Sequence, residues 1–218
     1  MTAWLDEDAT TRLLSRPGPA IAPHLLGALI EHQCEEGLVR VRLTEVEAYN
    51  GADDPGSHAY RGRTPRTAVM FGPAAHLYCY LSYGMHVCCN VVAGADGEAS
   101  AVLLRAGEVV AGKDLARRRR TRPGGRVPTD RDLARGPGRL TSALGLRIEH
   151  NGVDLTRGPV RLRLPAVPSP SSGVDTGPRV GVSGPGGDGR TFPWRFWTQG
   201  DPSVSPYRPG RTRTVSSE

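Results

Sequence analysis

Residues 38–49 alternate apolar with charged side chains, a pattern typical of a β-strand that has one face covered. Since neighbouring side chains of a strand point to opposite faces, Glu45, Glu47 and Tyr49 share one face. Two interpretations of this strand stay open. Either it lies at a sheet edge with solvated acids, or it ends at a catalytic rim completed by the turn residues that follow and by His58.

Composition predicts a single loop-rich domain with a basic surface. The chain has 218 residues, of which 28 are glycine and 19 are proline, and 38% of its residues are hydrophobic. The net charge of +6 favours a polyanionic partner. Arginine carries almost all of the positive charge, because Lys113 is the only lysine. The planar guanidinium of arginine suits phosphates and base edges.

Neither a membrane segment nor a metal site is expected. No run reaches the about 18 apolar residues that a membrane-spanning helix needs. The first residues are acidic and lack the pattern of a signal peptide, which indicates a cytoplasmic protein, associated with the nucleoid if the protein is bacterial. No C-x-x-C spacing occurs, so reduced and mostly buried thiols, without zinc or an iron–sulfur cluster, are expected at Cys34, Cys79, Cys88 and Cys89.

Residues 77–92 predict a β-hairpin that turns at Gly84. Tyr83 lies at or near its tip, where it is either covered by the protein's own core or free to wedge into a nucleic-acid stack. A further buried strand is predicted to end at Arg105. A charge at the end of a buried strand usually has a partner, and Glu47 is the candidate.

Three groups of arginines are candidates for phosphate contacts. Arg61, Arg63 and Arg66 lie in a loop beside a tyrosine, and the alternative for them is a solvated basic loop. The run at 117–120 is predicted to lie on a solvated helix face or in a mobile loop, with phosphate contact as the less favoured alternative. Arg139 belongs to a Gly-rich turn that opens a helix, which is a weak signal for phosphate binding.

The rest of the chain predicts short elements joined by loops. Helices are expected at 1–16 and 22–30, and short strands at 160–164 and 179–182. The segments expected to be frayed or mobile are about 1–11, 165–178 and 207–218. No internal boundary is evident, so residues 1–218 are expected to form one domain.

Several blocks, spaced along the chain in one order, identify a family. They are Thr44–Tyr49, His58, Met70–Gly72, Leu77–Met85, Asn90, Leu103–Ala106, Gly136–Leu140, Arg179–Val182 and Pro193–Phe196. Together they closely resemble the alkyladenine (3-methyladenine) DNA glycosylase family, of the type without a helix-hairpin-helix motif, over about residues 12–206. The resemblance implies an α+β fold. This is a single domain with a curved, mainly antiparallel β-sheet flanked by helices, a protruding β-hairpin that inserts into DNA, and no metal or cofactor.

The resemblance also implies residue roles. Glu47 is implied to deprotonate the water that attacks C1′, and Arg105 to help hold that water and the carboxylate. The implied base pocket comprises Tyr49, His58, Tyr80, Asn90 and Val182. The residues implied to intercalate into DNA are Tyr83 and Met85, and those implied to contact its backbone are Arg61, Arg63, Arg66 and Arg139.

The sequence therefore predicts a monofunctional DNA N-glycosylase that flips and excises alkylated or deaminated purines and so initiates base-excision repair. The expected substrate is 3-methyladenine, with hypoxanthine and ethenoadenine as further candidates. The expected partner is double-stranded DNA that contains damaged bases, bound by a monomer without an obligate protein partner.

Two alternatives belong to other classes of protein. The first is a non-catalytic binder of damaged or distorted nucleic acid, which would not need the pair of Glu47 and Arg105. The second is a carbohydrate glycosidase that uses Glu45 and Glu47. It is disfavoured because carbohydrate sites usually add tryptophan platforms, whereas two of the three tryptophans here lie together in the C-terminal segment.

Overall fold

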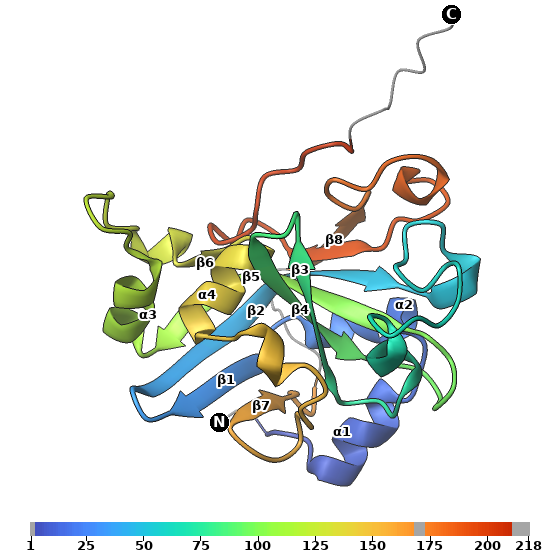
Figure 1. Cartoon of the computed structure of the whole chain (residues 1–218), viewed down its shortest axis with the longest axis horizontal. Coiled ribbons are helices and arrows are strands. Elements are labelled where there is room, and N and C mark those ends of the chain that lie inside the picture. Colours follow the sequence, from blue (N-terminus) through green and yellow to red (C-terminus); the bar gives the residue numbers. More distant parts are fainter. Residues whose placement is uncertain (1–2, 168–172, 211–218) are drawn as a thin grey trace, which may run out of the picture.

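The computed structural model describes residues 3–167 and 173–210, and an antiparallel sheet forms its centre (Figure 1). The main spatial order of the strands is β3–β4–β5–β2–β1–β7. These strands span Leu77–Ser82 (β3), His86–Val92 (β4), Ala101–Ala111 (β5), Gly37–Tyr49 (β2), Leu29–Cys34 (β1) and Val160–Arg163 (β7). The predicted α+β class with a mainly antiparallel sheet is confirmed.

β2 lies inside the sheet and pairs with three other strands. β5 pairs along one side of it, while β1 pairs with its first half and β9 (Arg195–Thr198) with Glu45–Glu47. The edge-strand interpretation of residues 38–49 is therefore wrong, and both acids are fully buried. The pairing with β5 shifts register on either side of Glu45, an irregularity that bends a strand and increases its twist.

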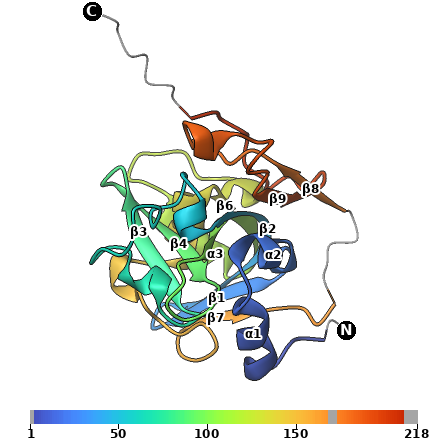
Figure 2. The same cartoon turned by 90° about the vertical axis from the view of Figure 1, so that its right-hand side faces the viewer.

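Two short strands complete the sheet, and helices cover it. β8 (Val174–Gly177) pairs with β9, and β6 (Ala134–Arg135) pairs with β5. The α-helices are α1 (Glu7–Leu14), α2 (Gly18–Ile21), α3 (Lys113–Arg120) and α4 (Pro137–Leu144). The 3-10 turns are Ala22–Leu25, Gly51–Asp53, Ala68–Phe71, Asp130–Asp132, Ile148–His150 and Pro185–Gly187. Figure 2 shows α1 and the β8–β9 pair at opposite ends of the view.

The main core lies between the sheet and these helices. Apolar side chains of β2 and β5, such as Leu43 and Leu104, join Leu14, Ile21 and Leu140 from the helices in one buried cluster. α4 packs against β4, β5 and α3, which places its N-terminus beside the β3–β4 hairpin. The longest α-helices among the described residues have eight residues, so none is long enough to cross a bilayer.

Three local predictions were wrong. The strand expected to end at Arg105 continues as β5 to Ala111, where it pairs with the first half of β2. The helix expected at 22–30 ends early, because Leu29 and Ile30 begin β1. Residues 179–182 form a turn instead of a strand, since Gly181 has a φ of +74°, which extended backbone does not allow. The strand of this region lies just before the turn, at 174–177.

The chain ends that were expected to be frayed belong to the fold where the structure describes them. The side chain of Asp6 caps α1, and the Leu5 amide donates to the Leu164 carbonyl at 2.9 Å. Near the other end, the Gly181 amide donates to the Arg208 carbonyl at 2.8 Å. The mobile loop expected at 165–178 is wrong for its strand residues, because they form β8. For 1–2, 168–172 and 211–218 the prediction lies outside the described residues.

The arginine run at 117–120 is largely built into the structure. Arg119 is only 11% exposed and donates to the last carbonyls of α4, at 2.8 Å from the Leu144 oxygen. Arg117 pairs with Asp114 and Asp130, each at 2.6 Å. The predicted solvated face is therefore wrong for Arg119, which fastens α3 to the end of α4, whereas Arg117 pairs with exposed acids at the surface.

Candidate active site

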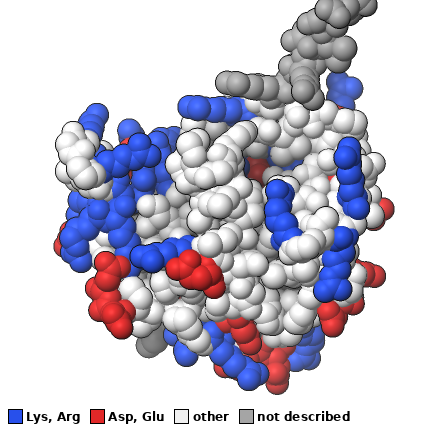
Figure 3. All heavy atoms as spheres, viewed as in Figure 1, with Lys and Arg blue, Asp and Glu red and all other residues white. Residues whose placement is uncertain are grey.

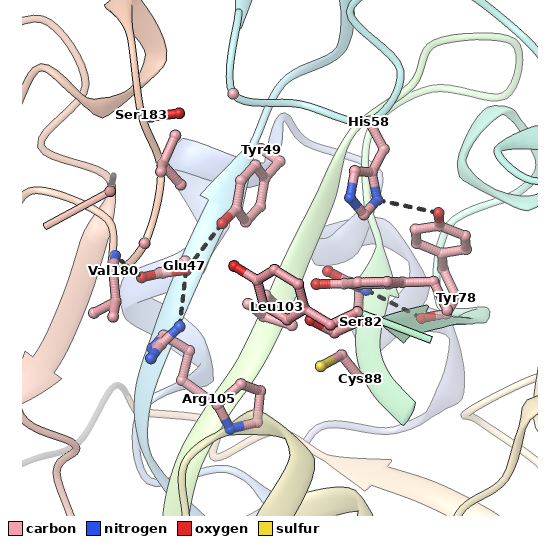
Figure 4. Close-up of a pocket in the computed structure, with 18 of the residues that line it drawn as sticks. Glu47, Tyr49, His58, Tyr78, Ser82, Cys88, Leu103, Arg105, Val180 and Ser183 are labelled. Atoms are coloured by element: carbon pink, nitrogen blue, oxygen red, sulfur yellow. Dashed lines mark hydrogen bonds and ion pairs between the residues drawn. The ribbon is translucent and has the colours of Figure 1, made fainter. Parts of the chain in front are cut away.

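A deep pocket of about 1000 Å³ opens at the end of β2 (Figure 4). Its walls come from β2, β5, the β3–β4 hairpin and the loop that carries His58, together with the turn at 180–183 and residues 208–210. A cavity of this size accepts a nucleotide-sized ligand. Because these segments are far apart in sequence, the pocket exists only once the sheet has assembled.

Glu47 forms the polar centre of the pocket. Its Oε1 accepts a hydrogen bond from the Val180 amide at 2.6 Å. Its Oε2 accepts from the Tyr49 hydroxyl at 2.9 Å and from Nη1 of Arg105 at 3.3 Å. A carboxylate offers about four acceptor positions, so three donors leave one position, on Oε1, for a further donor such as water.

Arg105 joins Glu47 to a second buried acid, Glu45. Nε of Arg105 donates to Oε1 of Glu45 at 2.9 Å, and Nε of Arg195 donates to the same oxygen at 2.8 Å. Ser205 adds its amide and its hydroxyl, at 2.7 and 2.9 Å. Burial lowers the pKa of Arg105, but the carboxylates of Glu47 and Glu45 outweigh it and raise that pKa above its ordinary value. Two carboxylates and two guanidiniums thus balance each other beneath the pocket.

A second buried ion pair holds two pocket loops together. Arg179 and Asp54 are fully buried and form a bidentate pair, with N–O distances of 2.5 and 2.6 Å. The Arg179 guanidinium also lies 4.5 Å from the ring centre of Tyr49. This pair positions Tyr49 and the turn whose Val180 amide binds Glu47. The prediction missed it, and only the Asp-Asp-Pro turn sequence hinted at a structured loop.

Aromatic side chains form the wall opposite Glu47. Figure 4 shows Glu47 and Tyr49 on one side of the pocket and His58 and Tyr78 on the other. The rings of His58 and Tyr80 meet edge to face at 4.5 Å, and Tyr78 stacks on Tyr80 at 5.8 Å. Nδ1 of His58 lies 3.3 Å from the Tyr78 hydroxyl. Tyr78 completes this wall and was missed, although it alternates with Tyr80 along the predicted strand.

Burial shifts the titration of this wall. It lowers the pKa of His58 to about 4, with a smaller contribution from the positive charge of Arg66. It raises the pKa of Tyr80, helped by the neighbouring Cys88, and raises that of Tyr49, helped by Glu47. At neutral pH this aromatic wall therefore presents an uncharged imidazole and uncharged phenols to the pocket.

The predicted pocket and catalytic residues meet in one cavity. Those that line it are Glu47, Arg105, Tyr49, His58, Tyr80, Asn90 and Val182. Asn90 is buried, and its Nδ2 donates to the Tyr78 carbonyl at 3.1 Å, which fixes the orientation of its amide. Glu45 does not line the cavity, because it lies beneath it in the ion-pair network.

The hairpin carries two exposed apolar side chains at its tip. Tyr83 is 89% exposed and Met85 72%. Tyr83 also lines the pocket and has a φ of +51°, in the left-handed region that few non-glycine residues adopt. The interpretation that the protein's own core covers Tyr83 is therefore wrong.

The predicted backbone-contact arginines lie on two sides of this hairpin. Arg61, Arg63 and Arg66 follow His58 and are exposed, and Arg66 reaches the pocket wall beside Tyr78. Arg139 is exposed on the first turn of α4. No group of three or more His, Cys, Asp or Glu side chains within 3–167 and 173–210 is arranged to hold a metal ion.

Comparison with known proteins gives this pocket its context. Residues 12–202 match the model of the family described as methylpurine-DNA glycosylase (MPG). The chain belongs to the methylpurine-DNA glycosylase family. The predicted family and enzyme class are confirmed, and the protein is a DNA N-glycosylase, which hydrolyses N-glycosidic bonds. Both alternatives, the non-catalytic binder and the carbohydrate glycosidase, are thereby set aside.

Similar bacterial proteins cover nearly the same length. A protein of Leifsonia xyli subsp. xyli is 55% identical over 189 residues, which are 86% of this chain and 87% of that protein. One of Streptomyces avermitilis is 49% identical over 98% of this chain and 100% of its own length. Both carry the name "Putative 3-methyladenine DNA glycosylase".

Proposed function

We propose that the enzyme flips alkylated or deaminated purines out of duplex DNA into this pocket and releases them by attack of water on C1′. A base inside a duplex does not present its glycosidic bond, so the nucleotide leaves the stack first. The observation that carries the proposal is the Glu47 carboxylate, which is buried, lines the pocket and is held in place by three donors. 3-Methyladenine is the first substrate, with hypoxanthine and ethenoadenine as further ones.

Glu47 acts on the attacking water. It accepts a proton from that water while the oxygen bonds to C1′ and the base departs with the electron pair of the glycosidic bond. The transition state resembles a sugar cation, so the negative carboxylate beside it also stabilises the developing charge. Arg105 keeps the carboxylate in place through its bonds to Glu47 and Glu45.

The aromatic slot selects the base. A cationic alkylpurine that lies between electron-rich rings gains about 0.5–2 kcal/mol of attraction. His58 suits this role because it is uncharged at neutral pH and does not repel the cation. The fixed amide of Asn90 crowds the 2-amino group of guanine and so disfavours the normal base. The carbonyl of Val182 completes the site of the attacking water.

No amine of the described residues competes with water as the nucleophile. Strand cleavage by a bifunctional glycosylase needs an amine that attacks C1′. Lys113, the only lysine, pairs with Asp130 at 2.9 Å, is 42% exposed and does not line the pocket. Arginine stays protonated and cannot replace it. The enzyme therefore releases the base and leaves the sugar–phosphate backbone uncut.

The proposal is tested with Glu47→Gln. This variant should still bind a duplex that contains hypoxanthine or ethenoadenine, because the shape of the pocket is kept. Its single-turnover release of the base, and of 3-methyladenine from methylated DNA, should be about 10²–10⁴-fold slower, the usual cost of losing a general base.

Glu108→Gln is the matched control, because Glu108 lies on β5, pairs with Arg42 and does not line the pocket. It should release bases at the wild-type rate. Near-wild-type release by Glu47→Gln would remove Glu47 from the mechanism.

A further inference from the structure

Five arginines gather around a single carboxylate beside α4. We call Arg120, Arg122, Arg131, Arg135 and Arg139 the arginine cluster. Asp132 is the acid at its centre, and its N–O distances to Arg131, Arg135 and Arg139 are 3.7, 3.7 and 3.8 Å. These distances are too long for hydrogen bonds, and the close partner of Asp132 is the Thr129 hydroxyl at 2.7 Å. Nε of Arg135 donates to the Val204 carbonyl at 2.8 Å, but most guanidinium donors of the cluster have no hydrogen-bond partner among the described residues.

The excess of positive over negative charge in the cluster is clearest at Arg120. It is half-buried, donates from Nε to the Leu133 carbonyl at 3.1 Å, and makes no ion pair with any described residue. Burial lowers its pKa, and the like charges of Arg139 and Arg122 lower it further. A half-buried cation beside two others is stabilised by an anion from outside, and a phosphate matches the planar fork of a guanidinium.

The arginine cluster adjoins the pocket and the hairpin. Pro137, at the start of α4, lines the pocket, and the Thr141 hydroxyl of α4 donates to the Val87 carbonyl of β4 at 2.5 Å. A Cβ added at Gly138 would lie 3.1 Å from the Cβ of His86, so α4 and the hairpin are in close contact. The cluster is thus continuous with the surface that carries Tyr83.

The charge of this face lies on both sides of the hairpin. In Figure 3 lysine and arginine gather on the left, over α3 and the loop that follows it, and a smaller group lies on the right. The surface between the two groups is mostly uncharged. The loop with Arg61, Arg63 and Arg66 is on the side of the hairpin away from α3 (Figure 1).

We propose that the arginine cluster binds backbone phosphates of the duplex arm on the α4 side of the flipped nucleotide. The loop of Arg61 and Arg63 holds the other arm, so the two arms have separate binding surfaces. This inference rests on the proposed function, because it takes the hairpin and the pocket as the point where the lesion sits. Each phosphate that the cluster neutralises releases counterions, which makes its contribution dependent on salt.

The test compares two double variants. Arg122→Ser with Arg139→Ser removes two exposed arginines of the cluster. Arg157→Ser with Arg161→Ser removes two exposed arginines near α1 and β7, away from the hairpin, as the control. Binding to an ethenoadenine duplex is measured between 50 and 200 mM salt. The cluster variant should bind roughly 10-fold more weakly, and its slope of log K against log salt should fall by about 2.

Shortened duplexes then locate the contact. The loss in the cluster variant should disappear when the duplex arm on one side of the lesion is removed, and persist when the other arm is removed. An unchanged salt slope, a loss equal to that of the control, or a loss that is the same on both shortened duplexes would overturn the proposal. Base release by the wild-type enzyme would keep the proposed function intact in each of these cases. A wild-type chain that binds no duplex would overturn both.

Discussion

Arginines form two contrasting regions in this enzyme. Beneath the pocket, Arg105, Arg179 and Arg195 each donate to a buried carboxylate, with N–O distances of 2.5–2.9 Å. In the arginine cluster beside α4, Asp132 is the one acid among the described residues that lies within 4 Å of any of the five guanidiniums, and its distances to three of them are 3.7–3.8 Å. The same side chain thus holds the shape of the active site in one region and stays available to an external anion in the other.

Solvent explains the difference. An unpaired charge in a protein interior costs several kcal/mol, so the buried arginines must have partners with close hydrogen bonds. Near the surface, water screens like charges, and an unmatched cluster costs little. The distance from each guanidinium to its nearest acid therefore separates the arginines that hold the fold together from those whose donors are left over.

The largest expected effect comes from breaking the matched region. Glu45→Gln removes the negative charge that Arg105 and Arg195 share, and should lower the free energy of unfolding by roughly 3–5 kcal/mol. Urea denaturation measures it. Glu108→Gln, which breaks a partly exposed pair with Arg42, should cost less than about 1 kcal/mol. Equal losses in the two variants would show that burial does not separate the two kinds of pair.

The second largest effect is expected at the uncharged tip of the β3–β4 hairpin, which lies between the two basic surfaces. Tyr83→Ala should weaken binding to a lesion duplex by roughly 1–3 kcal/mol, the scale of one stacked base. Binding to undamaged duplex should weaken less, because it depends on phosphates. Fluorescence titration on matched duplexes measures both. Equal losses on damaged and undamaged DNA would mean that Tyr83 does not act as a wedge.

A smaller effect on stability distinguishes two neighbouring arginines of the run at 117–120. Arg119→Ala removes the donor to the last carbonyls of α4 and should destabilise the fold by about 1–2 kcal/mol. Its exposed neighbour provides the control, since Arg118→Ala should change stability by less than about 0.5 kcal/mol. Thermal unfolding of both variants measures the difference. Similar stabilities would contradict the structural role of Arg119.

The smallest effect comes from Arg66, whose positive charge makes the smaller contribution to the lowered pKa of His58. The pKa of His58 lies near 4 in the fold and at 6.5 when unperturbed, so the unfolded chain binds more protons between these pH values. The contribution of His58 to stability is therefore present above pH 6.5 and is lost as the pH falls toward about 4.

Arg66→Gln checks the cause of this shift. It should raise the pKa of His58, because the nearby positive charge is gone, but the pKa should stay below 6.5, because burial remains. An NMR titration of the imidazole measures the change. An unchanged pKa in the variant would show that Arg66 does not act on His58.

Local patterns predicted a large share of this molecule. Alternation identified β2, and the turn at Gly84 identified the hairpin, because both signals involve residues close together in the chain. Predicting a partner for Arg105 was correct for a similar reason, since a buried charge demands a counter-charge. The predicted helix at 22–30 failed because tertiary pairing draws Leu29 into β1 and overrides local preference.

Residue order alone was enough to identify the family, the antiparallel α+β class and the pairing of Glu47 with Arg105. Long-range packing was needed for the rest of the site. Asp54 meets Arg179 across 125 positions of sequence, and the Val180 amide reaches Glu47 across 133. Such contacts depend on the register of strands and on the irregular pairing around Glu45. No short stretch of sequence encodes that register, because it is set where distant segments pack together.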